Sequence, residues 1–232
     1  MSDNRNIWYL EEVNLFEFFC PFNNAEDRYH KQPKRSYKKN EFIYFSDDRS
    51  DQVYFIHEGA VKIAGYTEEG NEHIKAVLGK GEVFGELAVY GEESRKDYAQ
   101  AAENTELCIL PRDQVVSLMR DVNNFQAFFN RLIGERVIYT QKRLESLLFK
   151  DARTRIAEYI LEQADKTGKR KGEFIELRNY LTHQEIASYT GTSRQTVTTL
   201  LNQFREEGYI DFNRKCITIK DIRKLKNSLI AV

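Results

Sequence analysis

Glycine is spread unevenly along this chain, and its distribution constrains the fold more than any other feature of the sequence. Between residues 41 and 111, glycines separate short aromatic and β-branched runs such as EFIYF, QVYFIHEG, AVKIAGY, HIKAVLGKG, EVFGELAVYG and LCILP. After Pro111, only Gly134 precedes Gly168. Short strands with turn residues every 8–12 positions or so are typical of an all-β roll or sandwich. The sequence therefore predicts a β-roll followed by a helical second half.

The segment after Pro111 has helical periodicity with an apolar seam close to the 3.5-residue repeat of a helix pair. Two interpretations fit this seam: a parallel homodimer formed through the helix, or packing of the helix on its own β-roll. The homodimer is favoured, because the helix is long and apolar on one face for a small monomer. The seam comprises Phe129, Ile133, Arg136, Thr140, Leu144 and Leu147.

Composition excludes several classes of protein. A hydrophobic fraction of 41% supports a packed core. The longest apolar runs fall far short of the roughly 18 residues of a membrane span, and the start MSDNRNIWYLEEV lacks the apolar region of a signal peptide. Cys20, Cys108 and Cys216 lie far apart and form no metal-finger spacing. We therefore expect reduced thiols in a cytoplasmic protein with no bound metal.

Charge is also distributed unevenly. Residues 151–232 contain fifteen Lys and Arg against eleven Asp and Glu, a net of +4. Because the whole chain has a net charge of −1, residues 1–150 contribute −5. This asymmetry suggests that a polyanion binds at the C-terminal end, although uneven surface solvation would produce it too.

The stretch TGTSRQTVTTLLNQF, residues 190–204, meets the demands of a helix-turn-helix. Two short helices that cross closely need a small residue at the crossing, supplied by Ala187, and a turn residue that tolerates positive φ, supplied by Gly191. Apolar side chains must also join the helices, here Ile186, Val197 and Leu200. An ordinary helical hairpin is the alternative.

The flanking residues support a winged helix-turn-helix. Thr182-His-Gln-Glu185 has the form of a capping box at the start of the first helix. A short strand is expected at residues 174–177, after a Gly- and Lys-rich turn at residues 164–174. The terminal segment GYIDFNRKCITIK contains two strand-like runs around an Asn-Arg-Lys turn, which predicts a wing hairpin.

In a helix-turn-helix, the second helix enters the major groove of DNA with its N-terminal residues at the base edges. Arg pairs bidentately with guanine and Gln with adenine, so Arg194 and Gln195 are candidate base readers. Thr198 and Thr199 are expected on or near the same exposed face. Other short or basic side chains are candidate phosphate contacts: Thr182, His183, Ser193, Thr196 and Lys215.

Over essentially its whole length, the sequence resembles the CRP/FNR family of bacterial transcription regulators. The resemblance is carried by GEVFGEL (81–87), TRIA (154–157), LTHQEIA (181–187) and SRQTV (193–197). It implies an α+β fold with a jelly-roll-like, cyclic-nucleotide-binding β-roll (residues 1–118), a dimerisation helix (119–150) and a winged helix-turn-helix (151–232). It also implies a homodimer that binds a two-fold symmetric DNA operator, with RNA polymerase as the expected protein partner and no membrane association.

The resemblance also implies effector-binding residues in the roll. The cyclic-nucleotide pocket of the family uses a Gly-Glu pair, matched by Gly85 and Glu86 before Leu87, and an Arg on the cyclic phosphate, matched by Arg95. Lys96 replaces the expected Ser, and Thr140 aligns with a purine-contacting Thr. Two alternatives stay open: a cyclic nucleotide as the effector, or another effector or none with a vestigial pocket. In a vestigial pocket, Glu86 and Arg95 could form an ion pair with each other.

Other features of the family pattern are altered or missing. Iron–sulfur members use an N-terminal cysteine cluster, whereas Cys20 stands alone, and His57 and His73 are expected to be ordinary roll histidines rather than haem ligands. We therefore expect neither cofactor. Gln195 replaces a common Glu, and Thr199 replaces a common Arg, which predicts an altered DNA half-site with an adenine preference at the Gln195 position.

Two other classes of function were weighed against this one. A cupin-like metalloenzyme needs a His-x-His set, but His73-Ile-Lys75 has lysine in place of the second ligand. A cyclic-nucleotide module that does not bind DNA would have no use for the capped helix, tight turn and wing. The sequence therefore predicts a DNA-binding regulator rather than an enzyme, without naming its effector, its operator, or activation versus repression.

Overall fold

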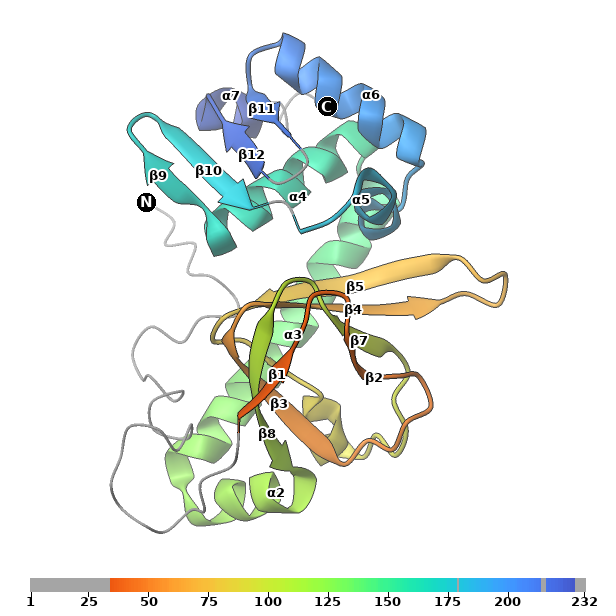
Figure 1. Cartoon of the computed structure of the whole chain (residues 1–232), viewed down its shortest axis with the longest axis vertical. Coiled ribbons are helices and arrows are strands. Elements are labelled where there is room, and N and C mark those ends of the chain that lie inside the picture. The colour runs from red at the N-terminus through yellow and green to blue at the C-terminus, as the bar shows by residue number, and fades with distance from the viewer. Residues whose placement is uncertain (1–33, 179, 214–215, 228–232) are drawn as a thin grey trace. The chain divides into compact units, whose positions relative to one another are not determined.

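The computed structural model describes residues 34–178, 180–213 and 216–227. The short amphipathic stretch that the sequence predicts at residues 9–19 lies outside these residues, as do Cys20 and Lys215. The described residues form two compact units (Figure 1), of which the first comprises residues 34–69 together with Lys75–Tyr139. The second comprises Gly70–Ile74 and the residues from Thr140 onward.

Two four-stranded sheets build the roll, as the glycine pattern predicts. Their strand orders are β1-β8-β3-β6 and β2-β7-β4-β5 (Figure 1). Residues 53–56 and 60–65 are each buried without interruption, so these two strands are covered on both faces. The strands are β1 (Lys34–Tyr37), β2 (Phe42–Tyr44), β3 (Gln52–Glu58), β4 (Ala60–Tyr66), β5 (Glu72–Gly79), β6 (Val83–Phe84), β7 (Tyr98–Ala101) and β8 (Thr105–Pro111).

The roll differs from the sequence prediction in two places. The lysine-rich run before residue 41 contains β1, which pairs antiparallel with β8. The run EVFGELAVYG forms only the two-residue β6 and then the 3-10 helix η1 (Glu86–Tyr90). Gly85 lies between them with φ of 75° and ψ of 11°. This left-handed backbone ends the strand, which residue preference alone does not reveal.

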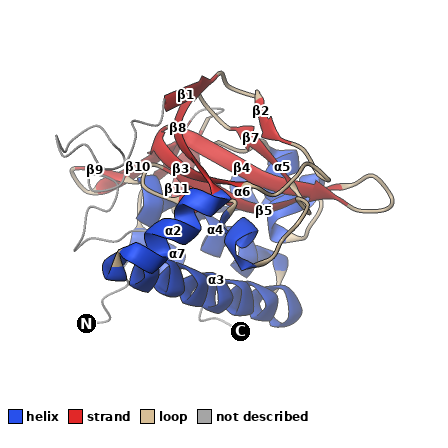
Figure 2. Ribbon diagram, turned by 90° about the horizontal axis from the view of Figure 1, so that it is seen from below, coloured by secondary structure: helices blue, strands red, loops and turns tan. Residues whose placement is uncertain are grey.

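Helix α2 (Arg112–Asp121) and the first half of α3 (Asn123–Phe149) complete the core of the first unit (Figure 2). Phe125 and Phe129 are fully buried against the roll, and Leu132 is nearly so. The predicted seam through Phe129 is therefore wrong in its first half. There, the helix packs on its own β-roll.

The second unit contains the elements expected of a winged helix-turn-helix. It comprises α4 (Ala152–Thr167), β9 (Lys169–Lys171), β10 (Phe174–Arg178), α5 (His183–Thr190), α6 (Arg194–Glu206), β11 (Ile210–Phe212), β12 (Cys216–Ile219) and α7 (Ile222–Asn227). Its sheet has the order β11-β12-β10-β9. The strand at residues 174–177 and the wing hairpin are confirmed. Part of the predicted turn at residues 164–174 is instead the edge strand β9, whose three side chains are all exposed.

Candidate functional site

Helices α5 and α6 pack through a small apolar interface. Ile186 and Ala187 of α5 are buried, as the sequence predicts. On α6, the buried residues are Val197, Leu201 and Phe204, whereas Leu200 is only half-buried. The buried face of α6 thus begins at Val197 and continues at i+4 and i+7, and the contact of Leu200 with α5 stays a prediction.

Side-chain caps define where both helices begin. At the start of α5, the Oγ1 of Thr182 accepts from the backbone N of Glu185 at 3.2 Å, and the backbone N of Thr182 donates to Glu185 Oε2 at 2.8 Å. This confirms the predicted capping box. At the start of α6, Ser193 Oγ accepts from the backbone N of Thr196 at 3.0 Å. Both hydroxyls are engaged as caps, and their phosphate contacts stay predictions.

The turn between the two helices depends on Gly191. Its φ of 63° and ψ of 44° lie in the left-handed region that favours glycine. A Cβ at this position would also lie 2.9 Å from Leu147 Cδ2 of α3. Any other residue would therefore strain the backbone and displace the side chain beneath it.

The outer face of α6 carries the candidate base readers. Arg194, Gln195 and Thr199 are exposed, as expected. Asn202 extends the row, because residues at i, i+4 and i+7 share one face of a helix. It is exposed as well. The sequence prediction stopped at Thr199 and missed Asn202, although helical spacing from Gln195 identifies it.

Thr198 does not belong to this outer face. It is half-buried, its hydroxyl donates to the carbonyl of Arg194 at 3.0 Å, and the same oxygen lies 3.0 Å from His183 Nδ1. Since the hydroxyl proton is used on the carbonyl, His183 donates its Nδ1–H to Thr198. Burial, and then the charge of Arg194, lower the pKa of His183. Thr198 therefore lies beside the exposed face and joins α5 to α6, and its contact with DNA stays a prediction.

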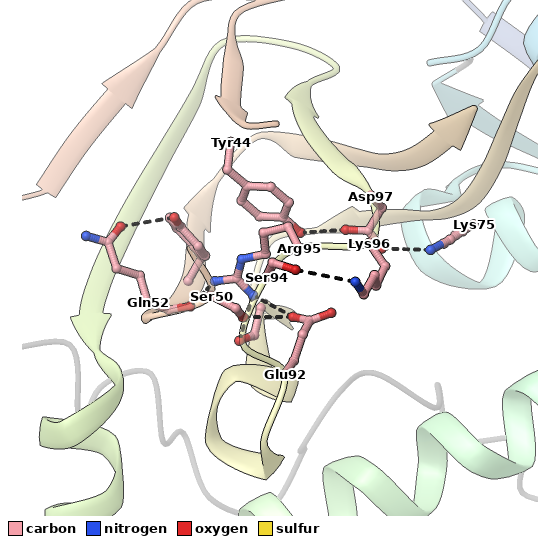
Figure 3. Close-up of polar contacts among 11 residues, drawn as sticks. Tyr44, Ser50, Gln52, Lys75, Glu92, Ser94, Arg95, Lys96 and Asp97 are labelled. Atoms are coloured by element: carbon pink, nitrogen blue, oxygen red, sulfur yellow. Dashed lines mark hydrogen bonds and ion pairs between the residues drawn. The ribbon is translucent and has the colours of Figure 1, made fainter. Parts of the chain in front are cut away.

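In the roll, Arg95 is held inside a network of protein groups (Figure 3). Its side chain is 2% exposed. Nη1 donates to the carbonyl of Gly85 at 3.2 Å and to Glu92 Oε2 at 3.3 Å, and Nη2 donates to the carbonyl of Gln52. Ser50 Oγ donates to the same Glu92 oxygen at 2.8 Å. Arg95 thus ties the start of β3 to the segments on both sides of η1.

Two tyrosines complete the surroundings of Arg95. The guanidinium carbon lies 4.7 Å from the ring centroid of Tyr44 and 5.8 Å from that of Tyr54, within cation–π range. Burial raises the pKa of Tyr54 to about 12 and also raises the pKa of Tyr44. Both are therefore neutral phenols at physiological pH. Tyr44 donates to Asp97 Oδ1 at 3.2 Å, and Asp97 pairs with Lys75 at 3.0 Å (Figure 3).

Glu86 has a different partner from the one considered in the sequence analysis. Its Oε1 lies 3.0 Å from Nε of Arg136 on α3, and Arg136 also donates through Nη2 to the carbonyl of Val83. The alternative of a Glu86–Arg95 ion pair is therefore wrong. The sequence prediction places Arg136 only in the apolar seam of the long helix. It lies four positions before Thr140, on the same helical face, and that spacing identifies it as a pocket candidate.

The remaining effector candidates differ in exposure and in their contacts. Leu87 is 49% exposed, and Lys96 is exposed with its Nζ 3.3 Å from Ser94 Oγ. Gly85 brings its backbone close to Arg95, since a Cβ there would lie 3.1 Å from Nη1. Thr140 is exposed on α3, in the second unit. Contact of Leu87, Lys96 or Thr140 with an effector stays a prediction.

The described residues include neither a candidate metal site nor a candidate membrane-spanning helix. Among these residues, no group of three or more His, Cys, Asp and Glu is arranged to hold a metal ion. No helix in the described part of the chain has the length and apolar character that crossing a membrane requires.

Two family models match the chain over the regions just described. The cyclic nucleotide-binding domain model matches residues 34–122, and the Crp-like helix-turn-helix domain model matches residues 154–228. A domain of the first kind followed by a domain of the second defines a class of protein: the DNA-binding transcription regulators with a cyclic-nucleotide-binding domain. The chain is such a regulator and not an enzyme.

Individual relatives specify the family. The global nitrogen regulator of Nostoc sp. is 31% identical, across 79% of this chain and 83% of that protein. The CRP-like cAMP-activated global transcriptional regulator of Mycobacterium tuberculosis is 28% identical, across 79% and 82%. The structure of a CooA mutant from Carboxydothermus hydrogenoformans is similar with a TM-score of 0.76 and 26% identity, over 97% of this chain and 99% of that one. The chain belongs to the CRP/FNR family of bacterial transcription regulators.

Proposed function

We propose that the protein binds a two-fold symmetric DNA operator as a homodimer in the bacterial cytoplasm and regulates transcription there through contact with RNA polymerase. The exposed row of Arg194, Gln195, Thr199 and Asn202 on α6 carries this proposal. In the homodimer, the two copies of α6 lie ~34 Å apart, one turn of DNA, and enter successive major grooves.

An exposed stripe on α3 supports the homodimer. Val137, Leu144 and Leu148 are 51%, 56% and 65% exposed. Together with the exposed Gly134 and Gln141 they repeat at intervals of three and four residues, the a and d positions of a heptad. A second copy of the same helix is the partner that such a seam fits. Most positions of this stripe follow those of the predicted seam by one residue, because Phe129 and Arg136 face the roll.

The protein partners that Glu86 and Arg95 each have bear on the effector. Glu86 is bound by Arg136, and two nitrogens of Arg95 are bound by protein oxygens. A cyclic nucleotide would have to displace these partners before its ribose and phosphate could bind. This favours the second alternative: control by another effector, or by none, through a roll whose cyclic-nucleotide pocket is vestigial.

Operator selection from random DNA tests the proposal. We expect a palindromic consensus whose affinity falls steeply with salt, because phosphate contacts release counterions and give a slope of about −0.9 per contact. A mobility-shift titration of the selected DNA at several salt concentrations measures this slope. Failure to select any sequence, or binding independent of salt, would contradict DNA recognition by α6.

A further inference from the structure

Arg155, the second residue of the TRIA segment, contacts three backbone carbonyls in two parts of the second unit. Nε donates to the carbonyl of Thr190 at 2.7 Å, and Nη2 donates to that of Gly191 at 3.1 Å. Nη1 donates to the carbonyl of Lys150, just after α3, at 2.6 Å. One side chain on α4 therefore holds both the turn of the helix-turn-helix and the end of the long helix.

The chemistry of the guanidinium makes these contacts restrictive. Its five N–H donors lie in one plane in a fixed fork, so the carbonyls that it binds are held at fixed positions relative to one another. Thr190 and Gly191 belong to the C-terminal end of α5, where carbonyls have no partner within the helix and the helix dipole favours a cation. Arg155 supplies both the hydrogen-bond donors for these carbonyls and the positive charge.

A second arginine acts on the preceding carbonyl. Arg143 of α3 donates to the carbonyl of Tyr189 at 2.8 Å, with its guanidinium carbon 4.0 Å from the centroid of the Tyr189 ring. The carbonyls of residues 189, 190 and 191 are thus bound in succession by two arginines. Helix α6 begins at Arg194, three residues after this clamped turn.

From this geometry we infer that Arg155 is a positioning residue for DNA recognition. It sets the direction of α6 relative to the end of α3 and thereby the separation of half-sites that the homodimer accepts. The inference rests on the proposed function, since half-site separation has meaning only for a dimer on a two-fold operator. Arg155 is half-buried, and three of its five N–H groups, one on each guanidinium nitrogen, donate to carbonyls of the protein.

Two variants distinguish a positioning role of Arg155 from a phosphate contact and from a role in stability alone. Arg155→Lys keeps the charge but loses the planar fork, and Arg155→Gln loses both. Arg170→Gln is the matched control, because it removes one positive charge from an exposed side chain on β9 of the same unit. Each protein is titrated, at a temperature where thermal unfolding shows it folded, against three kinds of DNA: the selected operator, operators with half-sites one base pair closer or farther apart, and a single half-site.

We expect wild type to prefer the selected spacing over the altered ones. In Arg155→Lys and Arg155→Gln, this preference should fall by about fivefold or more, as the loss of charge-assisted hydrogen bonds that hold the turn implies. Affinity for a single half-site and the salt slope should stay near those of wild type. Arg170→Gln should retain the full spacing preference.

Other outcomes would overturn the inference. If Arg155 contacted phosphate instead, Arg155→Gln would reduce the salt slope by about 0.9, and Arg155→Lys would restore wild-type binding. If Arg155 served stability alone, the variants would unfold at lower temperature but keep the wild-type spacing preference when folded. If wild type selected no operator at all, the proposed function would fail, and this inference with it.

Discussion

Glu86 and Arg136 form a nearly buried ion pair, with 3.0 Å between Oε1 and Nε, that joins the turn after β6 to α3. The side chains are 8% and 19% exposed. The carboxylate that the family resemblance assigns to a ribose hydroxyl is thus bound by the protein itself. The long helix is thereby tied to the segment where an effector is expected.

Breaking this pair should destabilise the protein. Arg136→Met leaves the Glu86 carboxylate buried without its cation, and we expect a loss of about 2–4 kcal/mol in the free energy of unfolding, slightly below the range for fully buried pairs because Arg136 retains some exposure. Urea unfolding measures the change. The double variant Glu86→Leu/Arg136→Met should be more stable than the two single losses predict, with a coupling of about 1–3 kcal/mol.

The same helix provides a control for this cycle. Arg131 and Glu135 form an exposed pair at 2.8 Å, four residues apart. Arg131→Met should change stability by less than about 1 kcal/mol, because exposed ion pairs contribute little. Equal losses for the two arginine variants would show that the burial of the Glu86 pair has no energetic consequence.

Calorimetry with cyclic AMP and cyclic GMP tests the state of Arg95. Because Arg95 is bound by Glu92 and by two carbonyls, we expect wild type to bind either nucleotide more weakly than about 1 mM. Glu92→Gln removes the competing carboxylate and should tighten binding measurably, since a phosphate then no longer competes with the Glu92 carboxylate for the guanidinium. Micromolar binding to wild type would show that a cyclic nucleotide displaces the network.

Gln195 should determine one base of the half-site. Gln pairs bidentately with adenine, whereas Glu accepts from cytosine, so Gln195→Glu should shift the selected base from adenine to cytosine, a discrimination of about 1–3 kcal/mol. Operator selection with both proteins measures the shift. Gln184→Glu makes the same change at an exposed position of α5. It is the control and should leave the selected bases unchanged. If Gln195→Glu selects the same base as wild type at this position, Gln195 does not contact a base.

The exposed stripe on α3 should hold the homodimer together. Leu144→Glu or Leu148→Glu places like charges opposite each other across a two-fold seam, so we expect monomers at concentrations where wild type is dimeric. Analytical ultracentrifugation measures this, and operator affinity should fall with it. Lys142→Glu changes an exposed residue off the a and d positions and should remain dimeric. A dimer that survives both leucine changes would require another interface.

Two histidines should make stability depend on pH. Burial lowers the pKa of His57 and His183, with Lys34 and Arg194 acting in the same direction. The unfolded chain therefore binds protons more readily, so stability is present above the ordinary pKa of about 6.5 and is lost as pH falls below it. The urea midpoint should be lower at about pH 5.5 than at about pH 7.5. Between these two pH values, the urea midpoint of the double variant His57→Gln/His183→Gln should fall by less than that of wild type. An equal fall in the double variant and wild type would contradict this account.

Local signals in the sequence were sufficient for much of the fold. The capping box of Thr182 and Glu185, the left-handed turn at Gly191 and the change in glycine spacing at Pro111 each depend on residues close together in the chain. Such features follow from backbone conformation and short-range hydrogen bonds. They identified the roll, the long helix, the helix-turn-helix and the wing without tertiary information.

Partner choice was decided by tertiary structure alone. Glu86 pairs with Arg136, fifty positions later in the chain, rather than with Arg95, and Thr198 is turned toward His183. Composition offers many arginines to one glutamate, and only packing brings a particular one within reach and excludes water from the pair. For the same reason, the sequence determined that α3 has an apolar seam, while the contact of Phe129 with the roll decided which residues remain exposed for a partner.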